Sequence, residues 1–222
     1  MRSLPLPVAL TARLLPVAVL ACAGWAYSAG PMSPKDDTEH NAAPQASSPH
    51  SPSASVAAKS YAAPPAPCGT VAAKTVTALV PEAKTAGKEL SATDESVRRG
   101  CSWSALKGYD YRWLDVTFEV KSSDALAQQA FATAGQDADR AGDPVKGVGD
   151  EARLTSGLTK KDGQETREAV VAVRKGNVLV TVTFNGSDFE SKGAPSASTM
   201  TEGAERAARD AVAGLGPAGA GS

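Results

Sequence analysis

Residues 169–184 read AVVAVRKGNVLVTVTF, in which two runs rich in valine and threonine are joined by Lys175-Gly176-Asn177. Valine and threonine favour extended backbone, and glycine and asparagine tolerate the positive φ angles of a tight turn. The pattern therefore predicts a β-hairpin with strands at 169–174 and 178–184. This hairpin is the element that the sequence indicates most clearly.

A second strand is predicted at residues 112–120, which read RWLDVTFEV. Apolar residues alternate with mainly polar ones, as expected when one face of an antiparallel strand packs on a core and the other faces solvent. Residues 101–103 and 153–155 are also strand-like. The predicted core face of 112–120 carries Leu114, Val116, Phe118 and Val120, and the opposite face carries Trp113, Asp115, Thr117 and Glu119.

Three segments have helical periodicity. The first covers 70–80 and stops at Pro81, and the second covers 123–140 with a serine cap at its start. The third, 204–215, follows Thr199 and Glu202, whose spacing fits a capping box. Helices and short sequential strands in this order predict an α+β fold, with a mainly antiparallel sheet packed by helices. The apolar stripe expected on the second helix is Ala125, Leu126, Ala130, Phe131 and Ala134.

The chain of 222 residues has a formal net charge of -1. Because it lacks the basic excess that attracts phosphate backbones, we expect no nucleic-acid partner. Residues 30–67 are dominated by Pro, Ser and Ala, which bury too little apolar surface to offset conformational entropy, so we expect a disordered spacer. The predicted organisation is a signal or anchor segment at 1–29, this spacer at 30–67, and one folded domain at 68–217.

The N-terminus has the layout of an export signal, with Arg2 and Arg13 before the apolar residues 14–20. Residues 19–22 read Val-Leu-Ala-Cys, which is similar to a bacterial lipobox and predicts lipid attachment at Cys22. Two alternatives stay open: an uncleaved membrane anchor, or signal cleavage after Ser28. We expect the domain on the extracytoplasmic face of the cell membrane, held there by a lipid or by a single N-terminal anchor.

The remaining cysteines, Cys68 and Cys101, lie at the start of the foldable region. In an exported chain we expect them to form a disulfide, which leaves Cys22 as the odd cysteine that lipidation or signal removal accounts for. A bond between them would close a loop of about 34 residues and stabilise the domain by roughly 3.5 to 4 kcal/mol. The interpretation that both are free buried thiols remains as an alternative.

Residues 68–215 resemble the actinobacterial lipoproteins that contain the domain of unknown function 3558. The resemblance is carried by the cysteine pair, the strand that begins Cys101-Ser102-Trp103, the loop at 145–152 (VKGVGDEA) and the late hairpin. It implies an exported N-terminus, a low-complexity spacer and an α+β domain with two cysteines. It also implies a location in the cell envelope and no assigned catalytic residues.

Residues that carry common chemistry are sparse in the predicted domain. It has no histidine to activate a serine or thiol and no G-x-S-x-G sequence. Residues 147–152 fit a dinucleotide fingerprint by letter, but a strand-like segment follows where a helix is required. We therefore expect no catalytic residue, cofactor or metal site. Asp115 and Glu119 remain as the one carboxylate pair that glycoside cleavage could use.

Four aromatic residues gather within eleven positions: Trp103, Tyr109, Tyr111 and Trp113. Such side chains favour ligand or partner surfaces, although packing in the core or within a hairpin explains the cluster better. We expect a non-enzymatic, envelope-tethered binding or sensor module for a partner protein, a wall component or a small ligand. The alternatives are a cell-wall enzyme that uses paired carboxylates and a structural accessory subunit of an envelope complex.

Overall fold

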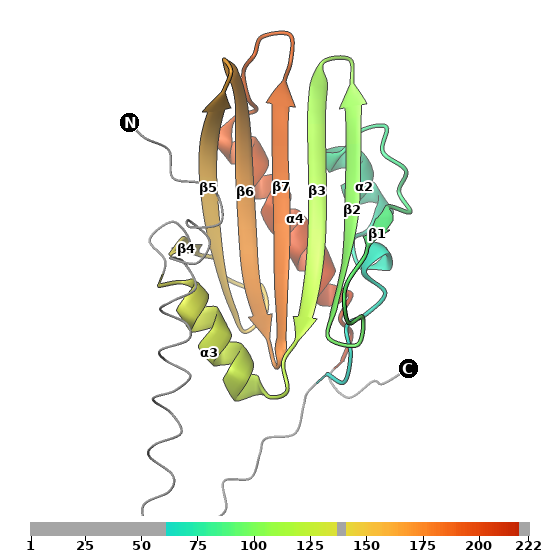
Figure 1. The fold of residues 1–222 in the computed structure, drawn as a ribbon, viewed down its shortest axis with the longest axis vertical. Helices are drawn as coiled ribbons and strands as arrows, with labels where there is room; N and C mark the ends of the chain where they lie inside the picture. Colours follow the sequence, from blue (N-terminus) through green and yellow to red (C-terminus); the bar gives the residue numbers. More distant parts are fainter. Residues whose placement is uncertain (1–60, 137–140, 218–222) are drawn as a thin grey trace, which may run out of the picture. The chain divides into compact units, whose positions relative to one another are not determined.

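The structure is a computed structural model that describes residues 61–136 and 141–217 (Figure 1). Cys22 and the predicted signal segment lie outside the described residues. No helix in the described ranges combines the length and the apolar character needed to cross a bilayer. The elements are η1 (Pro67–Gly69), α2 (Ala73–Leu79), β1 (Lys88–Leu90), β2 (Arg98–Lys107), β3 (Asp110–Val120), α3 (Asp124–Ala134), β4 (Asp143–Pro144), β5 (Glu151–Lys161), β6 (Gln164–Lys175), β7 (Val178–Asp188) and α4 (Ala197–Ala213).

The strands form one antiparallel seven-stranded sheet in the order β1-β2-β3-β7-β6-β5-β4 (Figure 1). β3 and β7, which are distant in sequence, pair along their full length at the centre of the sheet. The predicted α+β class is therefore confirmed. Two short edge strands, β1 and β4, were not predicted, because each has too few residues to show an alternating pattern.

The predicted hairpin is β6 and β7, and both strands run further than expected. Gly176 takes the positive φ of the turn, at 55°. Alternate residues along both strands are buried, including Val171, Val173, Val180 and Val182. β6 also forms a hairpin with β5, which lies along the edge of β6 that faces away from β7.

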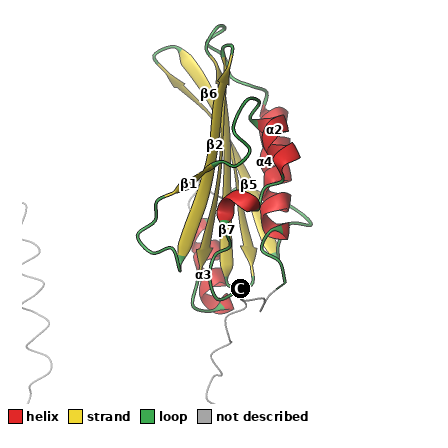
Figure 2. Cartoon of the chain, turned by 90° about the vertical axis from the view of Figure 1, so that its right-hand side faces the viewer, coloured by secondary structure: helices red, strands yellow, loops and turns green. Residues whose placement is uncertain are grey.

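The main core lies between one face of the sheet and the helices α2 and α4, which Figure 2 shows on the same side of the sheet. Small residues on α4 allow it to lie close to the strands. Gly203 is the extreme case, since a Cβ there would come within 2.7 Å of the Phe184 ring. The predicted capping box is wrong: the helix begins at Ala197, and the Ser196 hydroxyl accepts the capping hydrogen bond from the Thr199 N–H.

Among the described residues, α3 covers part of the opposite face, which is called the open face below. The Arg153 guanidinium lies 3.8 Å over the Phe131 ring and donates to the Phe131 carbonyl, which fixes α3 against the β5 and β6 side. Ser123 caps this helix as predicted. The predicted apolar stripe is rotated from the observed one, because Ala127 is buried whereas Leu126 is 46% exposed.

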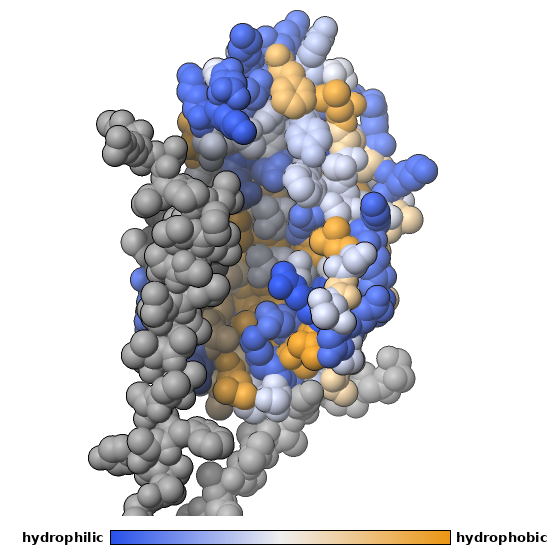
Figure 3. Space-filling model, viewed as in Figure 1, coloured by the Kyte–Doolittle hydropathy of each residue, from blue (hydrophilic) through white to orange (hydrophobic). Residues whose placement is uncertain are grey.

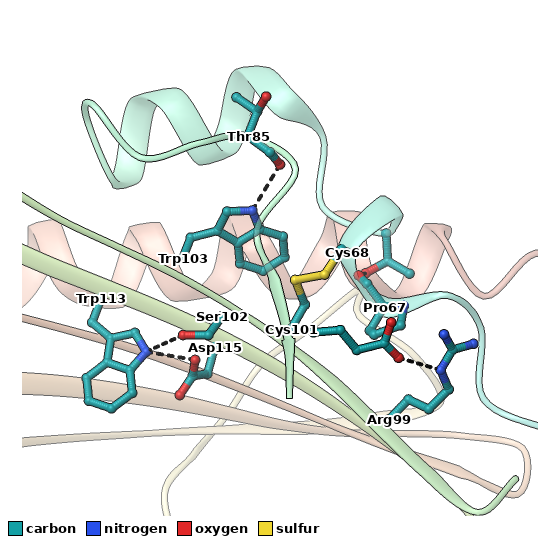
Figure 4. Close-up of a disulfide and its surroundings, with 11 residues drawn as sticks. Pro67, Cys68, Thr85, Arg99, Cys101, Ser102, Trp103, Trp113 and Asp115 are labelled. Atoms are coloured by element: carbon teal, nitrogen blue, oxygen red, sulfur yellow. Dashed lines mark hydrogen bonds and ion pairs between the residues drawn. A yellow bond between two sulfur atoms is a disulfide. The ribbon is translucent and has the colours of Figure 1, made fainter. Parts of the chain in front are cut away.

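The predicted disulfide is present between Cys68 and Cys101, with their Cα atoms 5.1 Å apart (Figure 4). The packed region begins earlier than the boundary expected at residue 68. Tyr61 is buried and its N–H donates to the Asn177 side chain, while Asn177 donates back to the Tyr61 carbonyl. Residues 61–67 therefore belong to the domain and not to the spacer.

Candidate functional site

The four aromatic residues singled out in the sequence are divided between the two faces of the sheet. Trp103 pairs with Leu114, so it lies on the core face, where it is 2% exposed and its Nε1 donates to the Thr85 carbonyl at 3.0 Å (Figure 4). The interpretation of Trp103 as part of a binding surface is therefore wrong. Its role is to fill the core beside the disulfide.

Trp113 lies on the open face and is 38% exposed. It stands on β3 between Ser104 of β2 and Asn185 of β7. Its Nε1 lies 2.7 Å from the Ser102 Oγ and 2.8 Å from the Asp115 Oδ1, so one edge of the indole is fixed by two acceptors (Figure 4). The ring is held in place while much of its surface remains open to solvent.

Tyr111 and Phe189 continue the aromatic surface towards the end of the sheet. Tyr111 shares the open face with Trp113, two positions along β3, and pairs with Leu106 of β2. Its ring stacks with that of Phe189, with centroids 6.1 Å apart and 24° between the planes. Phe189 is 45% exposed, and Tyr109 in the adjacent turn is 59% exposed. We call these residues the aromatic patch: Leu106, Tyr109, Tyr111, Trp113 and Phe189.

The backbone that carries the aromatic patch is held by its own hydrogen bonds. The Phe189 N–H donates to the Tyr109 carbonyl at 3.0 Å, which ties the segment after β7 to the β2–β3 turn. Asp188 accepts from the Ser191 hydroxyl and from the backbone of Ser191 and Glu190, and these bonds lower the pKa of Asp188. The patch is thus a rigid surface at one end of the sheet, where Figure 3 shows orange residues among pale and blue ones on the open face.

Phe189 and Leu106 were not predicted as site residues. Phe189 joins the patch through β7, which the sheet brings beside β3 from a distant part of the sequence. No local pattern identifies that neighbour. Leu106 follows the strand-like residues 101–103 and could have been found by extending their alternation, because it falls on the same face as Ser102 and Ser104.

Asp115 and Glu119 both lie on the open face of β3, where four residues of extended strand place their Cα atoms about 13 Å apart. The carboxyl groups of paired glycosidase carboxylates lie roughly 5 to 9.5 Å apart. Each is also engaged elsewhere, Asp115 with the Trp113 indole and Glu119 in an ion pair with Lys121.

The glycine-rich loop at 145–152 is a structural turn. Gly147 and Gly149 both take positive φ, at 73° and 62°, and strand β5 follows at Glu151. Asp150 accepts from the Gly176 N–H at 2.7 Å and from the Lys175 ammonium at 2.9 Å, so the loop is tied to the β6–β7 turn. Burial acts to raise the pKa of Asp150, but these bonds and the Arg174 guanidinium outweigh it and lower the pKa.

Groups of metal-ligating side chains are not seen in the described parts of the chain: no three of His, Cys, Asp and Glu gather there. A concave region of about 240 Å³ lies on the helix side of the sheet, lined in part by Leu79, Arg112 and Phe184. The aromatic patch lies on the other face and is a separate feature.

No family model matches the chain, and no curated protein matches it either. Among solved structures, the chain is similar to a protein from Bacteroides thetaiotaomicron VPI-5482, with a TM-score of 0.32 and 10% sequence identity. The match covers 53% of this chain and 47% of that protein, so the chain spans about half the length of the structure it matches.

Proposed function

We propose that this chain is an extracytoplasmic, envelope-tethered binding module without catalytic activity, and that it recognises its partner through the aromatic patch. The observation that carries the proposal is the cluster of exposed aromatic rings on a rigid sheet. Exposed aromatic side chains on a fixed backbone lose little conformational entropy on binding, which is why such residues dominate recognition surfaces.

The position of the patch relative to the start of the domain supports a tethered role. Tyr61 is held by Asn177, which lies in the β6–β7 turn and also donates to the Lys121 carbonyl just after β3. The patch lies at the other end of β3, beside the β2–β3 turn. Since β3 has 11 residues, the two ends are separated by roughly 33 Å. A domain attached through the residues before Tyr61 would present the patch away from its attachment.

The disulfide supports an oxidising, extracytoplasmic compartment, because cytosolic thiols are kept reduced. Lipidation of Cys22, or retention of the N-terminal segment as an anchor, would then account for attachment to the membrane. The two-cysteine α+β domain is also in keeping with the resemblance to the lipoproteins that contain the domain of unknown function 3558.

Sedimentation with isolated envelope fragments tests the binding role. The full chain is compared with the Trp113→Ala and Tyr109→Ala variants, and with Leu158→Ala as the matched control. Leu158 is a comparably exposed residue on β5 that lies outside the patch. We expect the wild type and the control to sediment with the fragments and the patch variants to lose at least tenfold in affinity. Equal binding by all four proteins would show that the patch is not the recognition surface.

Intact-mass analysis of the membrane fraction tests the attachment. A diacyl adduct on Cys22 or a full-length chain in that fraction supports tethering, and the two have different masses. A chain that begins at Ala29 and is found only in the soluble fraction would contradict it.

A further inference from the structure

The side chains that surround the aromatic patch on the open face are hydroxyls, an amide and carboxylates. Trp113 pairs directly with Ser104 and Asn185, and the adjacent pairs on that face place Ser102 and Thr183 on either side of Asp115. Glu168 follows beyond Asn185 on β6. The neighbourhood of the rings is therefore polar, with several hydrogen-bonding groups and negative charge.

Two cations close in sequence to the patch, Arg112 and Lys107, belong to the other face. Arg112 alternates with Trp113 along β3, and its guanidinium donates to the Tyr111 and Ser187 carbonyls. Lys107 lines the concave region on the helix side together with Arg112. Lys192 lies in the segment between β7 and α4, three residues beyond Phe189. The residues that flank Trp113 on the open face of β2, β3 and β7 include the Asp115 carboxylate and no cation, because Arg98, the cation on that face of β2, lies opposite Glu119 at the far end of the strand. This arrangement disfavours phosphate, sulfate and other anions beside Trp113.

We propose that the aromatic patch binds a neutral polysaccharide chain. This inference rests on the proposed function and names the class of ligand that the patch recognises. A pyranose ring presents a face of C–H groups, which packs on an aromatic ring, and an edge of hydroxyls, which needs donors and acceptors. Trp113 supplies the ring, and Ser104, Asn185 and Asp115 supply the partners for the hydroxyls. The same surface would be a poor core for a protein interface, because carboxylates are depleted from such cores.

The arrangement of the rings fits a chain of sugars better than a single sugar. Trp113 and Tyr111 are two residues apart on one face of β3, about 6.8 Å along the strand. The Phe189 centroid lies a further 6.1 Å from that of Tyr111. The rings follow one another along the open face, with Trp113 and Phe189 exposed and Tyr111 half-buried, so successive units of an oligosaccharide can contact them in turn.

The rings are also fixed before a ligand arrives. The two bonds to the Trp113 indole, the stacking of Tyr111 on Phe189 and the bond from the Phe189 N–H to the Tyr109 carbonyl are all internal to the protein. Binding therefore requires little ordering of side chains.

Titration calorimetry of the full chain with defined neutral oligosaccharides tests the proposal. The probes are β-1,4-linked tetramers of glucose and of N-acetylglucosamine, each compared with its monomer. We expect at least one tetramer to bind tenfold or more tightly than its monomer. We expect Trp113→Ala to weaken that binding by about tenfold or more, while Trp113→Phe, which keeps an aromatic ring, stays within about threefold of the wild type.

Leu158→Ala is the matched control and is expected to bind the tetramer as the wild type does. Thermal unfolding of each variant shows whether it is folded, and Trp113→Phe together with Asn185→Ala tests the surface if Trp113→Ala is unstable. Failure of both tetramers to bind, while sedimentation with envelope fragments still depends on Trp113, would overturn the glycan assignment and leave a protein partner at the patch. If sedimentation does not depend on Trp113, the proposed function fails as well.

Discussion

Reduction of the Cys68–Cys101 disulfide is the perturbation whose effect follows most directly from the structure. The bond joins positions 33 residues apart and ties η1 to β2. The closed segment contains α2 and β1, which supply one end of the core and one edge of the sheet. When the bond is intact the unfolded chain cannot separate these two points, so the bond lowers the conformational entropy of the unfolded state.

The loop length sets the size of the effect. A loop of this length corresponds to about 3.8 kcal/mol of stabilisation at 25 °C. For a domain of this size each kcal/mol shifts the unfolding temperature by about 2 to 4 °C, so we expect reduction to lower it by roughly 8 to 15 °C. This is a large fraction of the net stability of an ordinary domain, about 5 to 15 kcal/mol.

The assay is thermal and urea unfolding of the full chain with and without reductant, with alkylation to count free thiols. The Cys68→Ala, Cys101→Ala double variant is the control, and its unfolding temperature should not change on addition of reductant. It should resemble the reduced wild type, with a further small loss because Cys101 is fully buried. Alkylation of both Cys68 and Cys101 in unreduced protein, or a shift below about 2 °C after complete reduction, would refute the reasoning.

Three further predictions concern positions away from the patch. Asn177→Ala removes a buried side chain that exchanges two hydrogen bonds with the Tyr61 backbone, and we expect a loss of about 2 to 4 kcal/mol in urea unfolding together with faster hydrogen exchange at Tyr61. Gly203→Ala places a Cβ within 2.7 Å of the Phe184 ring, and we expect a loss of about 1 to 3 kcal/mol despite the better helix propensity of alanine. The lowered pKa of Asp150 means that its carboxylate adds stability above the ordinary pKa, near 4, and loses that contribution as the pH falls through the lower folded value. The Asp150→Asn variant should therefore show a flatter dependence of unfolding free energy on pH between about 5 and 2.

Each of these predictions has an outcome that would contradict it. Gly157→Ala is the control for Gly203, since its Cβ would meet nothing within 4 Å, and an equal effect at both positions would rule out the clash. Unchanged exchange at Tyr61 in Asn177→Ala would show that the first described residues are held by other contacts. Parallel pH curves for the wild type and Asp150→Asn would show that Asp150 does not contribute to acid sensitivity.

The elements that could be predicted are those whose burial alternates along a long strand. In β3, Leu114, Val116 and Phe118 alternate with polar residues, and the sheet buries that face as expected. The β6–β7 hairpin was predicted from its valine- and threonine-rich runs and from the Lys175-Gly176-Asn177 turn between them. β5 was recognised only at 153–155, because its later residues are exposed and carry no apolar alternation. The β5–β6 turn at Asp162-Gly163, which takes positive φ at both residues, was not predicted.

The candidate site was predictable only in part, because it depends on which strands become neighbours. Trp103 and Trp113 look equivalent in the sequence, but the register of β2 against β3 pairs Trp103 with buried Leu114 and so places the two indoles on opposite faces. The chain between Tyr111 and Phe189 contains α3 and four strands, β4 to β7. The role of Asn177 was hidden in the same way, since its partner Tyr61 lies 116 positions away.

The hydroxyl of Tyr61 donates to the Gly216 carbonyl at 3.2 Å, so the first and last described segments of the domain meet. A domain with adjoining termini tolerates circular permutation. Joining the two ends by a short glycine linker and opening the chain at the exposed Asp162-Gly163 hairpin would keep every layer of the fold. The same property would allow the domain to be inserted into a surface loop of a reporter protein, with the aromatic rings displayed at its far end.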